Sequence, residues 1–370
     1  MAYQRSANPE KLDVPRRGYI DGATNPESVE LLADGEHVLF TNCRMIMGHT
    51  AYRAGRGLVY VQGAAFLSLG RILSDGSLEL VERSVVGGLT ATLGIDILKR
   101  AAGRFAAGTA FVAEGGNPIA VDGAAILLGG RGQARLLIVA PSGREVIGEI
   151  PLHGESSFAR RFNGIDQPNG VAADRDGNLY FGDIPNSNPV DALPSPVPSA
   201  VYRIPNAAIE ALAADRDVGV SQVQRIVMPG WVNGLAASPL DESIYAVSCA
   251  FHCPVGGGIY RLTPTDFAHG MLPEPLISGL GGGILDGVGI TRRRTLLASA
   301  PLEQTIHAFT PDGRHFVVMT DGANPVSLPA DFNICYPPVL GGEPGILVPD
   351  LTMGGPPGAG SISLLDFSGF

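Results

Sequence analysis

Charged residues and cysteines are scarce in this sequence. Only 17% of its 370 residues are charged and only four are cysteine, whereas 45% are hydrophobic. A chain with so little charge is expected to fold rather than stay disordered, and four cysteines cannot supply a disulfide framework. No apolar run approaches the ~18 residues needed to cross a bilayer. We therefore expect no membrane partner.

Basic residues are also in the minority. There are 26 Lys and Arg residues against 36 Asp and Glu residues, which gives a formal net charge of −10, and no basic run offers a surface for phosphates. This balance argues against a nucleic-acid partner. Residues 1–18 are polar and lack the apolar segment of an export signal, so a polar tail and a cytoplasmic location are expected. The sequence indicates no oligomeric state.

Glycine and proline, in contrast, are abundant, with 50 and 29 residues. They follow no G-X-Y period, which excludes collagen and favours a turn-rich, all-β protein. Asp-Gly or Ser-Gly pairs repeatedly precede short runs in which apolar residues alternate with other residues. This pattern predicts β-hairpins, because glycine supplies the positive φ of a tight turn. The clearest examples are residues 33–42, 74–81, 141–150, 174–183 and 311–320.

A second motif places a polar residue before Gly or Ser and then apolar residues. Its members are Glu27, Asn169, Asn233 and Asp286, and a fifth candidate contains Asn333. Repeats of about 50–60 residues with several strands each are typical of propeller blades. The sequence therefore predicts a six-bladed β-propeller with short helical insertions, formed as one domain by residues 19–370.

The first interval in this series, from Glu27 to Asn169, is much longer than the others. We expect it to hold more than one blade and an insertion within residues 44–130. Residues 88–107 have apolar side chains near helical spacing, and a second short helix is predicted over 207–213.

Equivalent inner-strand positions of a propeller face one another across its central channel. Glu27, Asn169, Asn233 and Asp286 are thus predicted to gather four oxygen donors on the axis. Two carboxylates and two amide carbonyls suit Ca²⁺, with Mg²⁺ or Mn²⁺ as alternatives, and leave coordination positions for water or substrate. Each residue taken alone is also an ordinary turn or strand-start residue.

These motifs resemble the senescence marker protein/gluconolactonase family, also called regucalcin-like, and more distantly diisopropylfluorophosphatase and the paraoxonases. PESVELLADGEHVLFTN resembles the family's opening Glu motif, PNGVAADRDGNLYFGD and NGLAASPLDESIYAVS its two Asn motifs, and LDGVGI its Asp motif. The resemblance implies a six-bladed propeller with one catalytic divalent cation held by Glu27, Asn169, Asn233 and Asp286.

The resemblance also implies a hydrolase that opens a lactone or cleaves an ester of a small molecule. A cation-polarised carbonyl would be attacked by water, with Asp286 as the base or as the nucleophile itself. Fold does not fix reaction, so two alternatives stay open. One is an isomerase, cyclase or strictosidine synthase-like enzyme, and the other is a non-catalytic calcium-binding propeller.

The substrate region departs from the family pattern. Gluconolactonase-like members carry an Arg where this chain has Gln167, while Arg161 and Asn163 look like the same motif displaced. We expect Asn169 rather than Asn163 to face the channel, and a fairly hydrophobic lactone or ester as substrate. Candidate substrate-binding residues are Arg161, Asn163, Trp231 and Asn333.

Histidines complete the list of candidates. The paraoxonase relatives use a His pair near the metal, so His49 and His153 are candidate acid/base residues. A structural histidine is the alternative for both.

Overall fold

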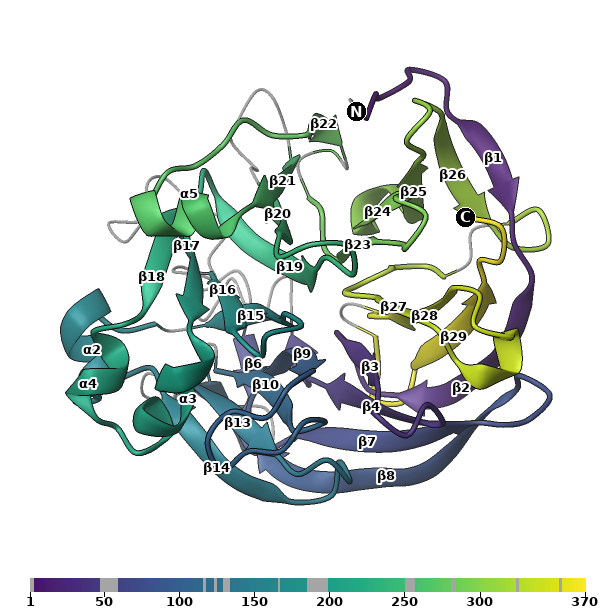
Figure 1. Cartoon of the computed structure of the whole chain (residues 1–370). Helices are drawn as coiled ribbons and strands as arrows, with labels where there is room; N and C mark the ends of the chain where they lie inside the picture. The colour runs from purple at the N-terminus through teal and green to yellow at the C-terminus, as the bar shows by residue number, and fades with distance from the viewer. Residues whose placement is uncertain are drawn as a thin grey trace.

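The computed structural model describes residues 3–46, 59–115, 118–122, 125–128, 134–165, 167–184, 199–249, 257–280, 282, 284–323, 326–352 and 355–370. Six sheets are arranged around a central axis (Figure 1), five with four strands and one with a fifth strand at its rim, which confirms the predicted six-bladed propeller. Each sheet runs from an inner strand near the axis to an outer strand at the rim, and most neighbouring strands are antiparallel.

The first three blades follow one another along the chain. Blade 1 contains β3 (Val29–Leu31), β4 (His37–Asn42), β7 (Ala65–Ile72) and β8 (Leu78–Leu89). Blade 2 contains β9 (Thr92–Ile97), β10 (Ala110–Glu114), β13 (Arg135–Val139) and β14 (Val146–Pro151). Blade 3 contains β15 (Pro168–Ala173), β16 (Leu179–Asp183), β17 (Ala200–Ile204) and β18 (Gln224–Val227).

The remaining blades bring the chain back to its start. Blade 4 contains β19 (Trp231–Ala237), β20 (Ile244–Cys249), β21 (Gly257–Leu262) and β22 (Ile277–Leu280). Blade 5 contains β23 (Val288–Ile290), β24 (Leu296–Ala300), β25 (Thr305–Phe309) and β26 (His315–Met319). Blade 6 contains β27 (Asn333–Cys335), β28 (Gly345–Asp350), β29 (Gly360–Asp366) and β2 (Arg16–Ala23).

Strand β2 closes the ring. It pairs antiparallel with β29, so an N-terminal strand is the outer strand of the last blade. Strand β1 (Glu10–Asp13) pairs in parallel with β26 on the rim of blade 5. The predicted polar tail, residues 1–18, is therefore partly built into the propeller. Its polar composition suits rim strands, which are largely exposed here.

The predicted turns are present. A glycine with positive φ lies in each of the five Asp-Gly or Ser-Gly segments, with φ between 71° and 91°, and each joins two antiparallel strands. These residues are Gly35, Gly76, Gly143, Gly177 and Gly313.

A seventh sheet lies outside the blades. It contains β5 (Met45–Ile46), β6 (Val59–Val61), β11 (Pro118–Asp122) and β12 (Ala125–Leu128), in the order β12-β11-β6-β5. The first two strands come from the connection between β4 and β7, and the other two from the connection between β10 and β13. All four strands fall within the predicted insertion range, 44–130.

The prediction of a helix within residues 88–107 is wrong. The end of β8 and the whole of β9 occupy this range, and all six residues of β9 are buried. Leu93, Ile95 and Ile97 alternate along β9 with Thr92, Gly94 and Asp96, and Leu98 follows the strand. The positions of Leu93, Ile97 and Leu98 imitate helical spacing. The second expected helix is confirmed as α3 (Asn206–Ala213). In the described ranges the structure also has α2 (Ser157–Phe162), α4 (Asp217–Val220), α5 (Pro264–His269), η2 (Pro301–Glu303) and η3 (Pro338–Leu340).

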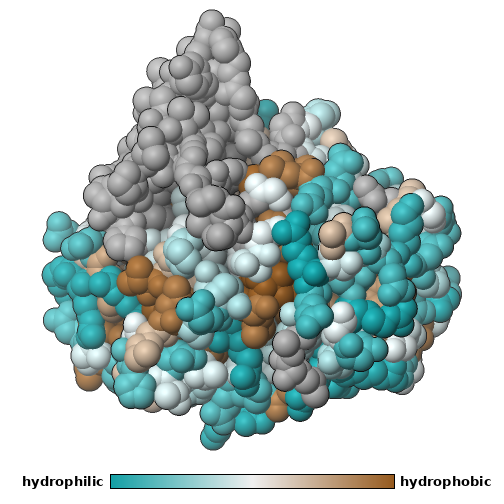
Figure 2. All heavy atoms as spheres, turned by 90° about the horizontal axis from the view of Figure 1, so that it is seen from above, coloured by the Kyte–Doolittle hydropathy of each residue, from teal (hydrophilic) through white to brown (hydrophobic). Residues whose placement is uncertain are grey.

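None of the helices in the described part of the chain is long and apolar enough to span a bilayer. On the face seen in Figure 2, the described surface mixes hydrophilic areas with smaller apolar ones.

Candidate functional site

The polar-glycine motif aligns the inner strands. A Cβ atom on Gly170 would lie 2.2 Å from the carbonyl oxygen of Asn233, and one on Gly234 would lie 2.1 Å from that of Asp286. Glycine is therefore required after the polar residue, because the backbone of the next blade fills the space of a side chain. The same contact links Gly94 to the carbonyl oxygen of Asn169.

This packing defines one level of the hub, the axial region where the six inner strands meet. Each of these glycines contacts, in the neighbouring blade, the residue that precedes the equivalent glycine. Leu93, Asn169, Asn233 and Asp286 therefore lie at the same level. Glu27 is linked to the last blade, because its carbonyl oxygen accepts a hydrogen bond of 2.9 Å from the backbone N–H of Asp331. The structure thus brings the four predicted ligands to one region.

The two amides contact each other. Nδ2 of Asn169 donates a hydrogen bond to Oδ1 of Asn233, and Nδ2 of Asn233 donates one of 3.1 Å to the carbonyl oxygen of Leu285. A cation that takes the Asn233 oxygen would replace the bond between the amides.

The two carboxyl groups are buried and incompletely bonded. The exposed fractions of Glu27 and Asp286 are 3% and 5%. Oε2 of Glu27 and Oδ1 of Asp286 have no hydrogen-bond partner among the described residues. Burial raises the pKa of Asp286 to about 7, and burial together with the charges of Asp286 and Asp331 raises the pKa of Glu27 well above its usual value.

This donor set fits a hard divalent cation. Two carboxyl oxygens, from blades 1 and 5, have no hydrogen-bond partner among the described residues. Buried charges are normally paired or bound to metal. The oxygens of Asn169 and Asn233 would complete a ligand set typical of Ca²⁺. Among the described residues no group of three or more His, Cys, Asp and Glu side chains is arranged to hold a metal, so the amides are essential to this assignment.

The sequence analysis missed a second group of residues at the hub. Nε2 of Gln167 donates a hydrogen bond of 2.9 Å to Oη of Tyr60, which lies on β6 of the seventh sheet and is fully buried. Burial raises the pKa of Tyr60, and the charges of Glu27 and Asp286 add to this effect. The motif pattern could not find Tyr60, because it belongs to an insertion with no equivalent in the other repeats.

Tyr60 shares a buried cluster with apolar side chains and a thiol. Cys43, Met45, Tyr60, Leu93 and Ala330 belong to one buried cluster. Burial raises the pKa of Cys43, with Glu27 as the next cause, and burial followed by Asp286 raises that of Cys249 to about 12. Both thiols are therefore protonated and form a weakly polar wall at neutral pH.

Three predicted residues lie away from the hub. Asn163 is exposed and ends α2 with a φ of 64°. Nη1 of Arg161 donates a hydrogen bond of 2.9 Å to the carbonyl oxygen of Val220 on α4. His153 follows β14, the rim strand of blade 2, and approaches Gly164. The structure does not bring these three residues to the four candidate ligands. His49 lies outside the described residues.

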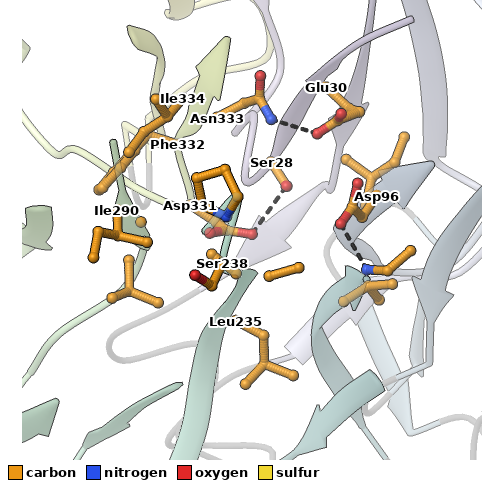
Figure 3. Close-up of a pocket in the computed structure, with 18 of the residues that line it drawn as sticks. Ser28, Glu30, Asp96, Leu235, Ser238, Ile290, Asp331, Phe332, Asn333 and Ile334 are labelled. Atoms are coloured by element: carbon orange, nitrogen blue, oxygen red, sulfur yellow. Dashed lines mark hydrogen bonds between the residues drawn. The ribbon is translucent and has the colours of Figure 1, made fainter. Parts of the chain in front are cut away.

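The remaining candidates are on inner strands. Trp231 begins β19, two residues before Asn233, and is partly exposed. A parallel β-bridge pairs Ser28 with Asp331, so Asn333, two residues further along, lies beyond the level of the four ligands. Nδ2 of Asn333 donates a hydrogen bond to Oε2 of Glu30 (Figure 3). The polar residue of blade 6 nearest the hub is Asp331, which is 5% exposed and accepts a hydrogen bond of 3.1 Å from Oγ of Ser28.

Comparison with solved structures reveals several propellers of this type. A proposed gluconolactonase has a TM-score of 0.52 at 16% identity, with 99% of this chain and 94% of that chain covered. A luciferin-regenerating enzyme has a TM-score of 0.54 at 13% identity, with 95% of this chain and 95% of that chain covered. A glucose dehydrogenase has the same TM-score and identity, with 96% of this chain and 99% of that chain covered. No family model and no curated protein matches the sequence.

The chain shares the propeller fold of these three proteins. The predicted resemblance is confirmed at this level. Because the three proteins differ in their described activities, the shared fold leaves the reaction to be argued from the site.

Proposed function

We propose that the protein is a metal-dependent hydrolase that opens a lactone or cleaves an ester of a small, fairly hydrophobic molecule. The observation that carries the proposal is a pair of buried oxygens, Oε2 of Glu27 and Oδ1 of Asp286, for which the described part of the chain offers no hydrogen-bond partner. The similarity in fold to a proposed gluconolactonase supports the same reaction class.

Glu27, Asn169, Asn233 and Asp286 would hold the ion, with Ca²⁺ preferred and Mg²⁺ or Mn²⁺ as alternatives. A divalent cation bound there would polarise the substrate carbonyl and stabilise the negative charge that develops on its oxygen.

The carboxyl of Asp286 is suited to accept a proton. Burial raises its pKa to about 7, and a base acts best when its pKa lies near the working pH. The other oxygen of this carboxyl would take the proton from an attacking water. Its pKa with a cation bound would be lower, since a neighbouring positive charge favours the ionised form.

Residues that share a buried cluster with Tyr60, taken as the walls of a substrate site, favour a substrate with few charges. Leu93, Ala330 and the protonated thiol of Cys43 are apolar or weakly polar, and Gln167 uses its amide nitrogen on Tyr60. Neither Gln167 nor these walls offers the cationic group that would hold an anionic substrate. An alkyl-substituted lactone or an aryl ester meets this description.

The test is turnover of such lactones and esters after treatment with EDTA. We expect activity to disappear, to return with Ca²⁺, and to fall at least ~100-fold in Glu27→Gln and Asp286→Asn. The exposed Glu155→Gln variant should match the wild type. Product formed in ¹⁸O-labelled water should carry one ¹⁸O atom.

Two results would replace the proposal with an alternative. Conversion of a substrate without ¹⁸O uptake would favour an isomerase or cyclase. Ca²⁺ binding that depends on Glu27 and Asp286, with no turnover across the panel, would favour a calcium-binding propeller.

A further inference from the structure

We propose that residues 3–13 form a pH-dependent strap on blade 5, which is released when the buried pair His307 and His315 takes up a proton. The strap lies at the rim of the propeller, and its assignment depends neither on the candidate metal site nor on the proposed reaction.

The strap follows the outer edge of blade 5. Its strand β1 pairs in parallel with β26 and lies beside it in Figure 1, and residues 4–8, which precede β1, are exposed. Val14, which follows β1, is 5% exposed, and its N–H donates a hydrogen bond of 2.9 Å to the carbonyl oxygen of Met319. Residues 3–13 can therefore leave blade 5 while Val14 and β2 remain in the propeller.

Two buried histidines lie beneath the strap. His307 on β25 and His315 on β26 are each 4% exposed, and Nδ1 of His307 lies 3.0 Å from Nε2 of His315. The backbone N–H of Ser6 donates a hydrogen bond of 3.0 Å to Nδ1 of His315. Nε2 of His307 lies 2.8 Å from Oε2 of Glu303 on η2. One chain of hydrogen bonds thus runs from the strap through both rings to Glu303.

The direction of this chain is fixed by its first donor. A backbone N–H can only donate, so Nδ1 of His315 carries no proton. Neutral His315 then carries its proton on Nε2 and donates it to Nδ1 of His307. His307 in turn carries its proton on Nε2 and donates to the carboxylate of Glu303. All three hydrogen bonds form together only when both rings are neutral.

An added proton removes the acceptor of Ser6 whichever ring takes it. If His315 is protonated, both of its ring nitrogens are donors, and Nδ1–H faces the N–H of Ser6. If His307 is protonated, its Nδ1–H donates to Nε2 of His315, which must then carry its own proton on Nδ1. Both states place two donors against each other at Ser6, so the bond that holds the strap is lost.

The surrounding charges act on the same pair. Burial lowers the pKa of His315 from 6.5 to about 4, and the charges of His307 and Arg5 act in the same direction. Burial also lowers the pKa of His307, against the opposing effect of Glu303. Arg5 belongs to the strap, so protonation of the rings also adds repulsion between the strap and blade 5.

The other attachments of the strap keep their charge state near neutral pH. Nη2 of Arg314 donates a hydrogen bond of 2.6 Å to Oε2 of Glu10, and this bond lowers the pKa of Glu10. Oη of Tyr3 donates one of 2.8 Å to the carbonyl oxygen of Arg294, and burial raises the pKa of Tyr3. These contacts hold the strap at pH 5 as at pH 7, so acid shifts the balance toward release without removing every attachment.

The direction of the pH effect follows from the lowered pKa of His315. Release exposes this ring, which then recovers an ordinary pKa near 6.5, so the released state binds a proton that the attached state does not. The preference for the attached state is therefore complete above pH ~6.5. It falls by up to about tenfold for each pH unit between ~6.5 and ~4.

Hydrogen–deuterium exchange of the full-length protein at pH 7.5 and pH 5 tests the strap. Protection is the exchange rate of an unstructured chain at the same pH divided by the observed rate. Protection of residues 3–13 should fall at least about tenfold from pH 7.5 to pH 5, while that of the buried strand β10 stays the same. Constant protection of the strap, or an equal loss in β10, would overturn the proposal.

A variant of the buried pair tests the cause. In His315→Asn the amide oxygen can accept the hydrogen bond of Ser6 and does not titrate, so protection of the strap should change less than about twofold between the two pH values. The matched control is His269→Asn, which removes an exposed histidine of α5 and should keep the wild-type pH dependence. A wild-type pH dependence in His315→Asn would overturn the proposal.

Two substitutions of the exposed Ser6 decide the question if His315→Asn does not fold. Ser6→Pro removes the backbone N–H, so the strap should be at least about twofold less protected at pH 7.5 and its protection should fall less at pH 5. Ser6→Ala keeps the N–H and should behave like the wild type. Equal protection of the two variants at both pH values would overturn the proposal.

Discussion

Nε2 of Gln167 and Oη of Tyr60 are joined by a hydrogen bond of 2.9 Å although the two residues lie 107 positions apart in the sequence. Gln167 precedes the inner strand of blade 3, and Tyr60 belongs to the seventh sheet. This bond connects the insertion to the hub. The added sheet therefore contributes a residue to the candidate site itself.

Replacing Tyr60 with phenylalanine should destabilise the protein by about 1–3 kcal/mol, because the buried amide of Gln167 loses its acceptor. Equilibrium unfolding in urea measures the change. The exposed Tyr19→Phe variant should lie within ~0.5 kcal/mol of the wild type. Equal stabilities of the two variants would show that the bond contributes nothing.

Gly234→Ala should disrupt the hub, because the new Cβ would lie 2.1 Å from the carbonyl oxygen of Asp286. We expect a loss of at least about 1–3 kcal/mol of unfolding free energy, as for other overpacked sites, and weaker cation binding. Gly148→Ala is the matched control, since the nearest atom would be 3.5 Å from its Cβ. Similar losses in both variants would contradict the close packing of the inner strands.

Ring closure by the N-terminal strand can be tested with adjacent residues of β2. Ile20 is 3% exposed and packs in the core shared by blades 1 and 6, whereas Tyr19 is 53% exposed. Ile20→Ala should cost about 2–5 kcal/mol, and Tyr19→Ala should cost much less. Thermal unfolding distinguishes them. An Ile20→Ala protein with the stability of the wild type would mean that packing of β2 is not needed to close the ring of blades.

The fold was predictable because its local signals repeat. Asp-Gly and Ser-Gly turns set the hairpins, and the residue before each inner-strand glycine indicated the axis. The seventh sheet was not predictable, because β6, from the connection between β4 and β7, pairs with β11, from the connection between β10 and β13, and no local pattern encodes such a pairing.

The candidate site was predictable only in part. The polar-glycine motif located four residues, but the register of blade 6 depends on the bridge between Ser28 and Asp331, which local sequence does not show. Arg161 and Asn163 matched a family motif, yet the chain ends a helix there.

Asp183 should make stability fall as pH rises. It is 1% exposed, and burial raises its pKa to about 7 from 3.8. Between these two values the carboxyl is protonated in the folded chain and ionised in the unfolded chain. The favourable contribution is therefore complete below pH ~4 and is lost as pH approaches ~7, by at most about 1.4 kcal/mol per pH unit.

Asp183→Asn should remove this dependence. Urea unfolding of both proteins between pH 4 and 8 gives the comparison, and the wild type should lose stability relative to the variant as pH rises. Parallel curves would show that Asp183 keeps an ordinary pKa.

Anomalous scattering from a crystal soaked in Mn²⁺ tests the central claim most directly. The account predicts one strong peak at the hub, within direct-coordination distance of oxygens from Glu27, Asn169, Asn233 and Asp286, and no such peak in Glu27→Gln/Asp286→Asn crystals. A peak elsewhere in the wild type, or none at the hub at saturating Mn²⁺, would contradict it.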